Sequence, residues 1–177
     1  MRKIIIWGLF IISGFNLQSQ SFSQLSFKTV SGDSVALSSF AGKKTLFLIV
    51  PLNQSDPIFG QVQAFKNRYH DTIRIVGVLS IEDGFQSSDI SSLQNMYNSL
   101  DIVLTEGSYT KKTSGANQSQ LMKWLTSKSM NMHFDMDASG IGHKFFVNES
   151  GRLFGVMPPQ TPLNASIIDR VVHSNVQ

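Results

Sequence analysis

Thioether and imidazole side chains are crowded into one short segment in the C-terminal third of the chain. Met130, Met132, His133 and Met136 fall within seven residues. Cu(I) favours soft sulfur ligands and also accepts imidazole nitrogen, so this segment could hold that ion. Methionine also fills irregular gaps in a core, and a loop that covers a sheet edge has the same composition. We expect the packing role, and keep periplasmic Cu(I) binding through this loop as an alternative.

The chain contains no cysteine, and this absence limits the chemistry that is open to it. Without a thiol there is no disulfide, no cysteine metal site and no mechanism that uses a thiolate. The four histidines show no H-x-x-x-H spacing, and no G-x-G-x-x-G string occurs. We therefore expect no cofactor, and we expect each histidine to be structural or solvated.

The first twenty residues have the order of a secretory signal peptide. Positive charge at positions 2–3 precedes an apolar run over 4–15, and polar small residues follow over 16–21. This run of 12 residues is shorter than the about 20 that a membrane-spanning helix needs. We expect cleavage of residues 1–20 and export of residues 21–177 to the periplasm or beyond, with no membrane span. Losing two positive charges lowers the net charge from +3 to +1, which argues against nucleic-acid binding.

The elements that must position any site follow one alternating order. Hydrophobic periodicity predicts two short strands near 22–30 and 34–37, followed by three strands at 45–50, 73–79 and 101–105. A helix follows each of these three strands, at 57–70, 89–100 and 117–127. The chain then forms a hairpin of 144–148 with 152–157 and a final helix at 162–173. Parallel crossovers followed by an antiparallel hairpin give a mixed central sheet with helices on both faces. We expect one α/β domain over 21–177.

Local strings along this order resemble the glutathione peroxidase branch of the thioredoxin fold. Residues 27–43 have that family's opening strand, turn, Leu-Ser pair and Gly-Lys. Residues 115–125 are similar to its Gly-Pro-Asn string and the helix that follows, and 144–153 to its closing hairpin. The order and spacing of the strings cover nearly all of the chain after residue 20. The resemblance implies a thioredoxin-like three-layer fold with a closing β-hairpin and a C-terminal helix, and by family alone a glutathione peroxidase.

The residues that would carry the family's chemistry are absent. Counting along the matched strings places its nucleophilic cysteine or selenocysteine at Gln54 or Ser55, and its glutamine at Glu82. Its Trp-Asn pair falls at Gly140 and Ile141. A serine hydroxyl cannot replace a thiolate in peroxide reduction, because it has no stable sulfenic-type adduct. The sequence thus excludes the thiol peroxidase mechanism.

Hydrolysis by Ser55 with Glu82 is disfavoured as well, because an acyl-transfer serine needs a positioned base. We expect Ser55 to cap the helix that starts at Pro57, and Glu82 and Asp83 to be solvated loop acids. The leading prediction is an exported binding or scaffold protein of the cell envelope, with an unknown protein or small-molecule partner. Metal binding, and an enzyme of unrelated chemistry in the former peroxidase pocket, are the alternatives.

Overall fold

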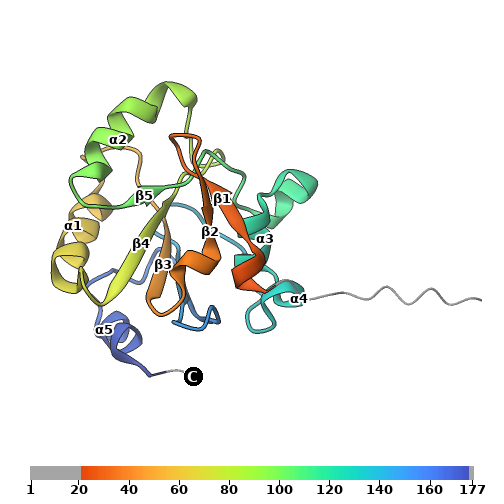
Figure 1. Ribbon diagram of the computed structural model, residues 1–177. Helices are drawn as coiled ribbons and strands as arrows, with labels where there is room; N and C mark the ends of the chain where they lie inside the picture. Colours follow the sequence, from red (N-terminus) through yellow and green to blue (C-terminus); the bar gives the residue numbers. More distant parts are fainter. Residues whose placement is uncertain (1–20, 176–177) are drawn as a thin grey trace, which may run out of the picture.

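The computed structural model describes residues 21–175. They form an α/β fold around a five-stranded mixed sheet (Figure 1). The predicted signal peptide lies outside the described residues. The strand order is β5-β4-β3-β6-β7. The strands are β3 (Lys44–Ile49), β4 (Ile73–Val78), β5 (Val103–Leu104), β6 (Lys144–Val147) and β7 (Leu153–Met157). The predicted mixed sheet is confirmed.

The central strand β3 explains the layered architecture. Every one of its residues is buried, as the unbroken apolar run predicts. It pairs in parallel with β4 on one side and antiparallel with β6 on the other. Its side chains alternate between two cores, with Leu46 and Leu48 in one and Phe47 and Ile49 in the other.

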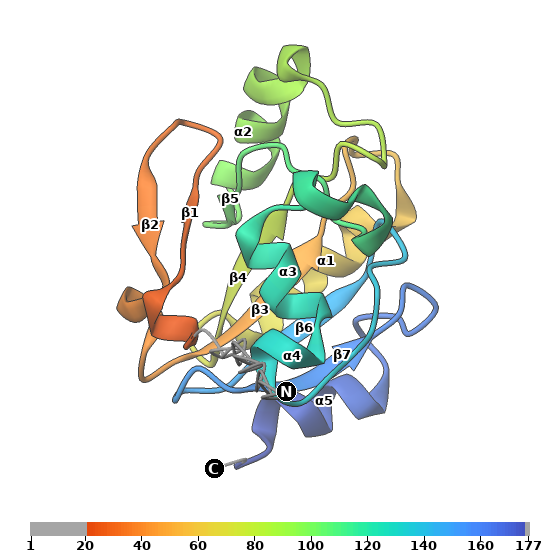
Figure 2. The ribbon, with the colours of Figure 1, turned by 90° about the vertical axis from the view of Figure 1, so that its right-hand side faces the viewer.

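Helices cover both faces of the sheet (Figure 2). The core of Leu46 and Leu48 is closed by α1 (Pro57–Tyr69), α2 (Ile90–Asn98) and α5 (Ser166–His173). The opposite core is closed by α3 (Gln120–Thr126) and α4 (Lys128–Asn131), and by the small hairpin of β1 (Ser26–Lys28) and β2 (Ser34–Ala36). Among residues 21–175, no helix has both the length and the apolar character needed to cross a bilayer.

Two helices, α3 and α5, begin three and four residues later than predicted. α3 begins at Gln120 because the Ser119 side chain accepts the N–H of Met122 and caps it there. α5 begins at Ser166, since a turn closed between Pro162 and Ala165 precedes it. The single turn α4 was not predicted. Short 3₁₀ segments occupy η1 (Phe22–Gln24), η2 (Leu37–Phe40), η3 (Ser87–Asp89) and η4 (Lys112–Asn117).

Candidate functional site

Three loops meet at the carboxyl ends of the parallel strands β3 and β4, where open α/β sheets bind their ligands. They are 50–56 after β3, 79–86 after β4 and 138–143 before β6. The third loop is tied to the end of β3, because the Gly142 N–H donates to the Ile49 carbonyl over 2.7 Å. The residues counted from the family strings lie on these loops.

Gln54 and Ser55 are exposed between β3 and α1. The Ser55 hydroxyl donates to Oδ1 of Asn53 over 2.6 Å, so it is directed to a neighbouring amide and not to a base. The prediction that Ser55 caps α1 is wrong. Asp56 is the cap, and its Oδ1 accepts the Ile58 N–H over 2.8 Å. Nothing in this geometry activates the serine as a nucleophile.

Glu82 is not the solvated acid that the sequence predicts. Its side chain is half-buried, and its oxygens accept the backbone N–H groups of Thr110 and Lys111 at 2.8–3.0 Å. The hydroxyls of Ser114, at 2.7 Å, and Ser80, at 3.3 Å, donate to the same carboxylate. Glu82 therefore anchors the loop between β5 and α3 to the end of β4.

The protonation state of Glu82 follows from these contacts. Burial on its own raises the pKa of the carboxyl group. The hydrogen bonds from the N–H groups of Lys111 and Thr110 and from the Ser114 hydroxyl lower the pKa by more than burial raises it. The net pKa is about 2. The side chain is a fixed anion at neutral pH, which suits an anchor and does not suit a general acid or base.

Asp83 is also partly buried, and it lies against Gly140. Its Oδ1 is 3.0 Å from where a Cβ of Gly140 would be, and Gly140 has a φ of +106°. Its Oδ2 is buried without a hydrogen-bond partner among the described residues. A side chain at position 140 would displace Asp83, so the tryptophan that the resemblance places there has no room. Ile141 packs against the core beneath β6.

The sequence did not single out the contact between Ser139 and His143. Nδ1 of the buried His143 accepts the Ser139 N–H over 3.2 Å and lies 2.8 Å from its hydroxyl. Burial, and then the charge of Lys144, lowers the pKa of His143 to about 4. The neutral ring stacks on Phe145. A base this weak is poorly suited to take a proton from serine near neutral pH, and the contact is structural.

Lys144, the first residue of β6, is buried beneath this loop. Its ammonium group donates to the carbonyls of Gly142 and Pro158. Burial lowers the pKa of Lys144 to about 8. The interior of the candidate site thus contains an anchored anion, a neutral imidazole and a buried amine, each held by backbone or loop groups.

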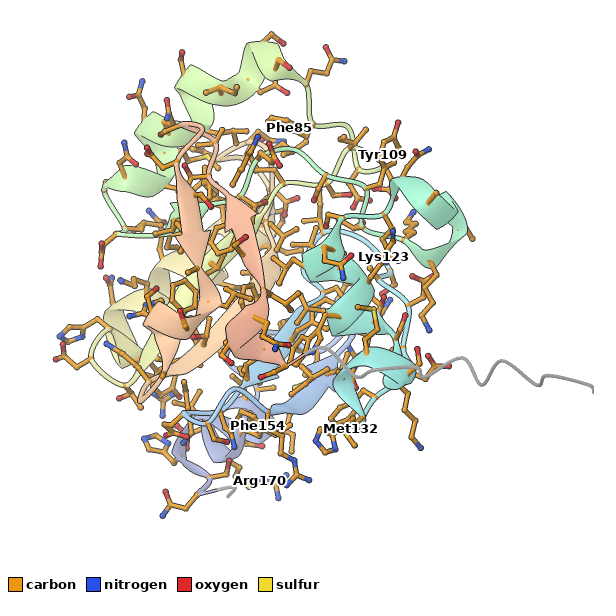
Figure 3. All side chains as sticks on the ribbon, turned by 45° about the vertical axis from the view of Figure 1, so that its right-hand side comes forward. Phe85, Tyr109, Lys123, Met132, Phe154 and Arg170 are labelled. Carbon is orange, nitrogen blue, oxygen red and sulfur yellow. The ribbon has the colours of Figure 1, made fainter. Side chains whose placement is uncertain are left out.

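The methionine-rich segment lies away from these loops, at the end of α4. Met130, Met132 and His133 line one hollow of about 300 Å³, together with Trp124. Met136 is not among the lining residues, and its N–H donates to the Thr126 carbonyl. Figure 3 shows Met132 at the periphery of the molecule. The structure thus brings three of the four predicted Cu(I) ligands to one hollow.

Known proteins resemble this chain in their solved structures and not in their sequences. No protein-family model matches the chain, and a search of curated proteins finds no match. Solved structures do match. The apo form of the glutathione peroxidase Trgpx has a TM-score of 0.61 at 16% identity, over 87% of this chain and 97% of that one. T. cruzi GPX1 has a TM-score of 0.64 at 9% identity, over 89% and 100%.

A thioredoxin family thiol:disulfide interchange protein from Chlorobium tepidum TLS has a TM-score of 0.52 at 16% identity, over 88% of this chain and 94% of that one. The chain therefore has the α/β thioredoxin-like fold, as predicted. Within that class its structural neighbours include glutathione peroxidases, and the cysteine-free sequence makes it a divergent example of the fold.

Proposed function

We propose that the chain is a non-catalytic binding protein of the cell envelope, built on a glutathione peroxidase-like scaffold and exported with cleavage of residues 1–20. One observation carries the proposal. The carboxylate of Glu82, at the position where the resemblance places the family's glutamine, is engaged by donors from the loop between β5 and α3. A group that serves as an anchor is not available to a substrate.

The other chemical routes through this site are closed for separate reasons. Peroxide reduction needs a thiolate or selenolate, and the chain has no cysteine. Hydrolysis needs a base beside the serine, and the Ser55 hydroxyl donates to Asn53. The imidazole of His143 is buried, and Nδ1 already accepts the Ser139 N–H.

The anchored loop presents apolar side chains that suit a protein partner. Ile81 is 36% exposed and Tyr109 39% exposed, and the Ile81 N–H donates to the Ser108 carbonyl beside Tyr109. Figure 3 shows Tyr109 at the surface. Tyrosine is enriched in protein interfaces, and a side chain on a rigid loop loses little entropy on binding. We propose that Ile81 and Tyr109, defined here as the loop-end surface, contact the partner.

Site-specific photocrosslinking in the source cells tests this surface. A photoreactive phenylalanine analogue at Tyr109 is expected to give one discrete crosslinked product, and the Ile81→Ser substitution should weaken that product. The same analogue at Asn67, an exposed residue on α1, is the matched control. Equal products from both positions, or none from Tyr109, would contradict the proposal.

Two further measurements test the rest of the proposal. The purified protein is expected to show no hydroperoxide turnover above the buffer rate with either glutathione or thioredoxin as reductant. Turnover at catalytic rates would refute a non-catalytic role. An intact mass from the envelope fraction should lack about twenty residues if the leader is cleaved. A full-length mass in the cytoplasmic fraction would refute export.

A further inference from the structure

The hollow beside Trp124 gathers soft donor groups that the proposed binding function does not use. Met130, Met132 and His133 line it together with Phe22 and Trp124, and its volume is about 300 Å³. We call it the Met/His hollow. Two thioethers and one imidazole are a donor set suited to a soft cation.

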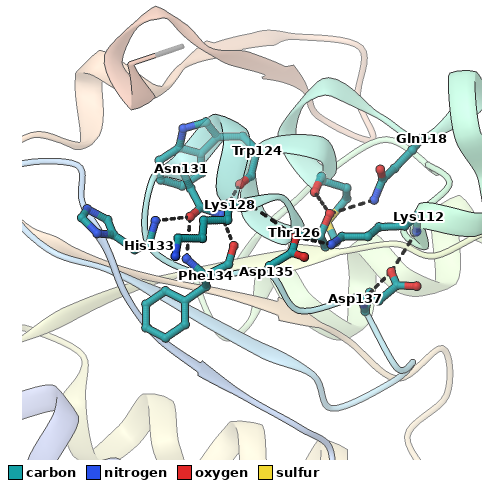
Figure 4. Close-up of polar contacts among 12 residues, drawn as sticks. Lys112, Gln118, Trp124, Thr126, Lys128, Asn131, His133, Phe134, Asp135 and Asp137 are labelled. Carbon is teal, nitrogen blue, oxygen red and sulfur yellow. Dashed lines mark hydrogen bonds and ion pairs between the residues drawn. The ribbon is translucent and has the colours of Figure 1, made fainter. Parts of the chain in front are cut away.

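A buried asparagine shapes the turn that carries these donors (Figure 4). Asn131 is only 5% exposed, and its Nδ2 donates to the carbonyls of Trp124 and Phe134 at 2.8 and 2.9 Å. Its Oδ1 accepts the N–H groups of His133 and Phe134, each at 2.8 Å. One side chain thus holds the turn to α3, so the donors are presented by a pre-organised backbone.

Met132 occupies a position that packing does not explain. It ends α4 with a φ of +68°, in the left-handed region where glycine or asparagine is usual. Its side chain is 64% exposed, so the thioether fills no gap in either core. A residue that is conformationally costly and poorly packed points to a role for the side chain itself.

The electrostatics of the hollow select among cations. Arg152 is one of the residues that line the hollow, and its positive charge opposes a divalent ion more strongly than a monovalent one, because repulsion scales with the charge. The residues that line the hollow include no carboxylate, so hard divalent ions lack their usual ligands.

We infer that Met130, Met132 and His133 bind one Cu(I) ion in the Met/His hollow. This site goes beyond the proposed partner binding, because it lies on α4 and the turn that follows it and not on the loop-end surface. Met136, which the sequence placed in the ligand set, is excluded from it. Failure of crosslinking at Tyr109 would therefore leave this inference standing, and loss of Cu(I) binding would leave the partner proposal standing.

An anaerobic competition titration against a chromophoric Cu(I) chelator tests the site. Trp124 is the only tryptophan of residues 21–177, so the protein without its proposed leader has a single fluorophore. We expect one Cu(I) per chain, sub-micromolar affinity and quenching of Trp124 fluorescence, with no response to Zn(II). No binding, or binding without any change in fluorescence, would overturn the inference.

Three variants of the same protein separate ligand loss from misfolding. Met132→Gly removes a donor but suits the left-handed backbone, so the protein should unfold at the same or a higher denaturant concentration while its Cu(I) affinity falls about tenfold or more. His133→Gln should weaken binding similarly. Met136→Leu is the matched control, with unchanged affinity expected. Equal affinity in the parent and in the Met132→Gly, His133→Gln double variant would overturn the inference.

Discussion

Replacing Glu82 by glutamine tests whether this carboxylate is the anchor of the site. The substitution keeps the shape of the side chain and removes its charge. It also introduces the amide that the glutathione peroxidase resemblance would place at this position. The amide offers one acceptor oxygen to the N–H groups of Thr110 and Lys111, which the carboxylate serves with both oxygens.

The size of the effect follows from the pKa of Glu82. A pKa lowered from 4.5 to about 2 corresponds to about 3 kcal/mol of folding stability at neutral pH. Because the folded-state pKa is the lower one, this stabilisation is present above 4.5 and is lost as the pH falls towards 2. Glutamine resembles the protonated acid, so Glu82→Gln should cost about 3 kcal/mol near neutral pH and about 2 kcal/mol less than that near pH 3.

Urea unfolding of residues 21–177, wild type and variant, followed by Trp124 fluorescence, measures both quantities. Glu106→Gln is the matched control, because Glu106 is an exposed acid in the loop that follows β5. We expect the control to change stability by less than about 0.5 kcal/mol. The reasoning is refuted if both variants lose the same stability, or if the cost of Glu82→Gln does not shrink in acid.

Three further predictions concern the surrounding loops. Asp56→Ala should cost about 1 kcal/mol in urea unfolding because it removes the α1 cap, whereas Ser55→Ala should be near neutral, and the reverse order would contradict the assignment of the cap. The folded-state pKa of Lys144 is about 8 and the unfolded value 10.5, so the stability of the wild type should rise by about 2 kcal/mol from pH 8 to pH 10. Lys144→Met should remove that rise, and a rise that persists would show that another group titrates. Gly140→Ala should cost about 1–3 kcal/mol, since it adds a Cβ close to Asp83 at a positive φ; thermal unfolding at the wild-type temperature would contradict this.

The strands were predictable because local pattern determines them. The run at 45–50 is apolar on both faces, and β3 is buried on both faces. The start of α1 at Pro57 was predicted correctly, but its cap is Asp56 and not the predicted Ser55. The start of α3 was predicted too early, because the Ser119 cap sets it at Gln120.

The anchoring role of Glu82 had no local signal in the sequence. Its donors in the loop after β5 lie 28–32 residues further along the chain, and only the folded structure brings them to the end of β4. The contact between Ser139 and His143 had a weak signal, a serine four residues before a histidine at the start of a buried strand. Soft-ligand clustering was visible because Met130, Met132 and His133 are close in sequence, and the structure was needed to exclude Met136.

The position of β6 has a consequence for how the chain matures. β3 is complete by Ile49, but its second neighbour, β6, begins only at Lys144. While the polypeptide emerges from the ribosome, β3 therefore has an unpaired, apolar edge for roughly a hundred residues of elongation, and such an edge binds chaperones or aggregates. The sheet closes only when the last fifth of the chain arrives. For the export that we propose, this order of synthesis means that the sheet cannot close before residues 144–157 have also crossed the membrane.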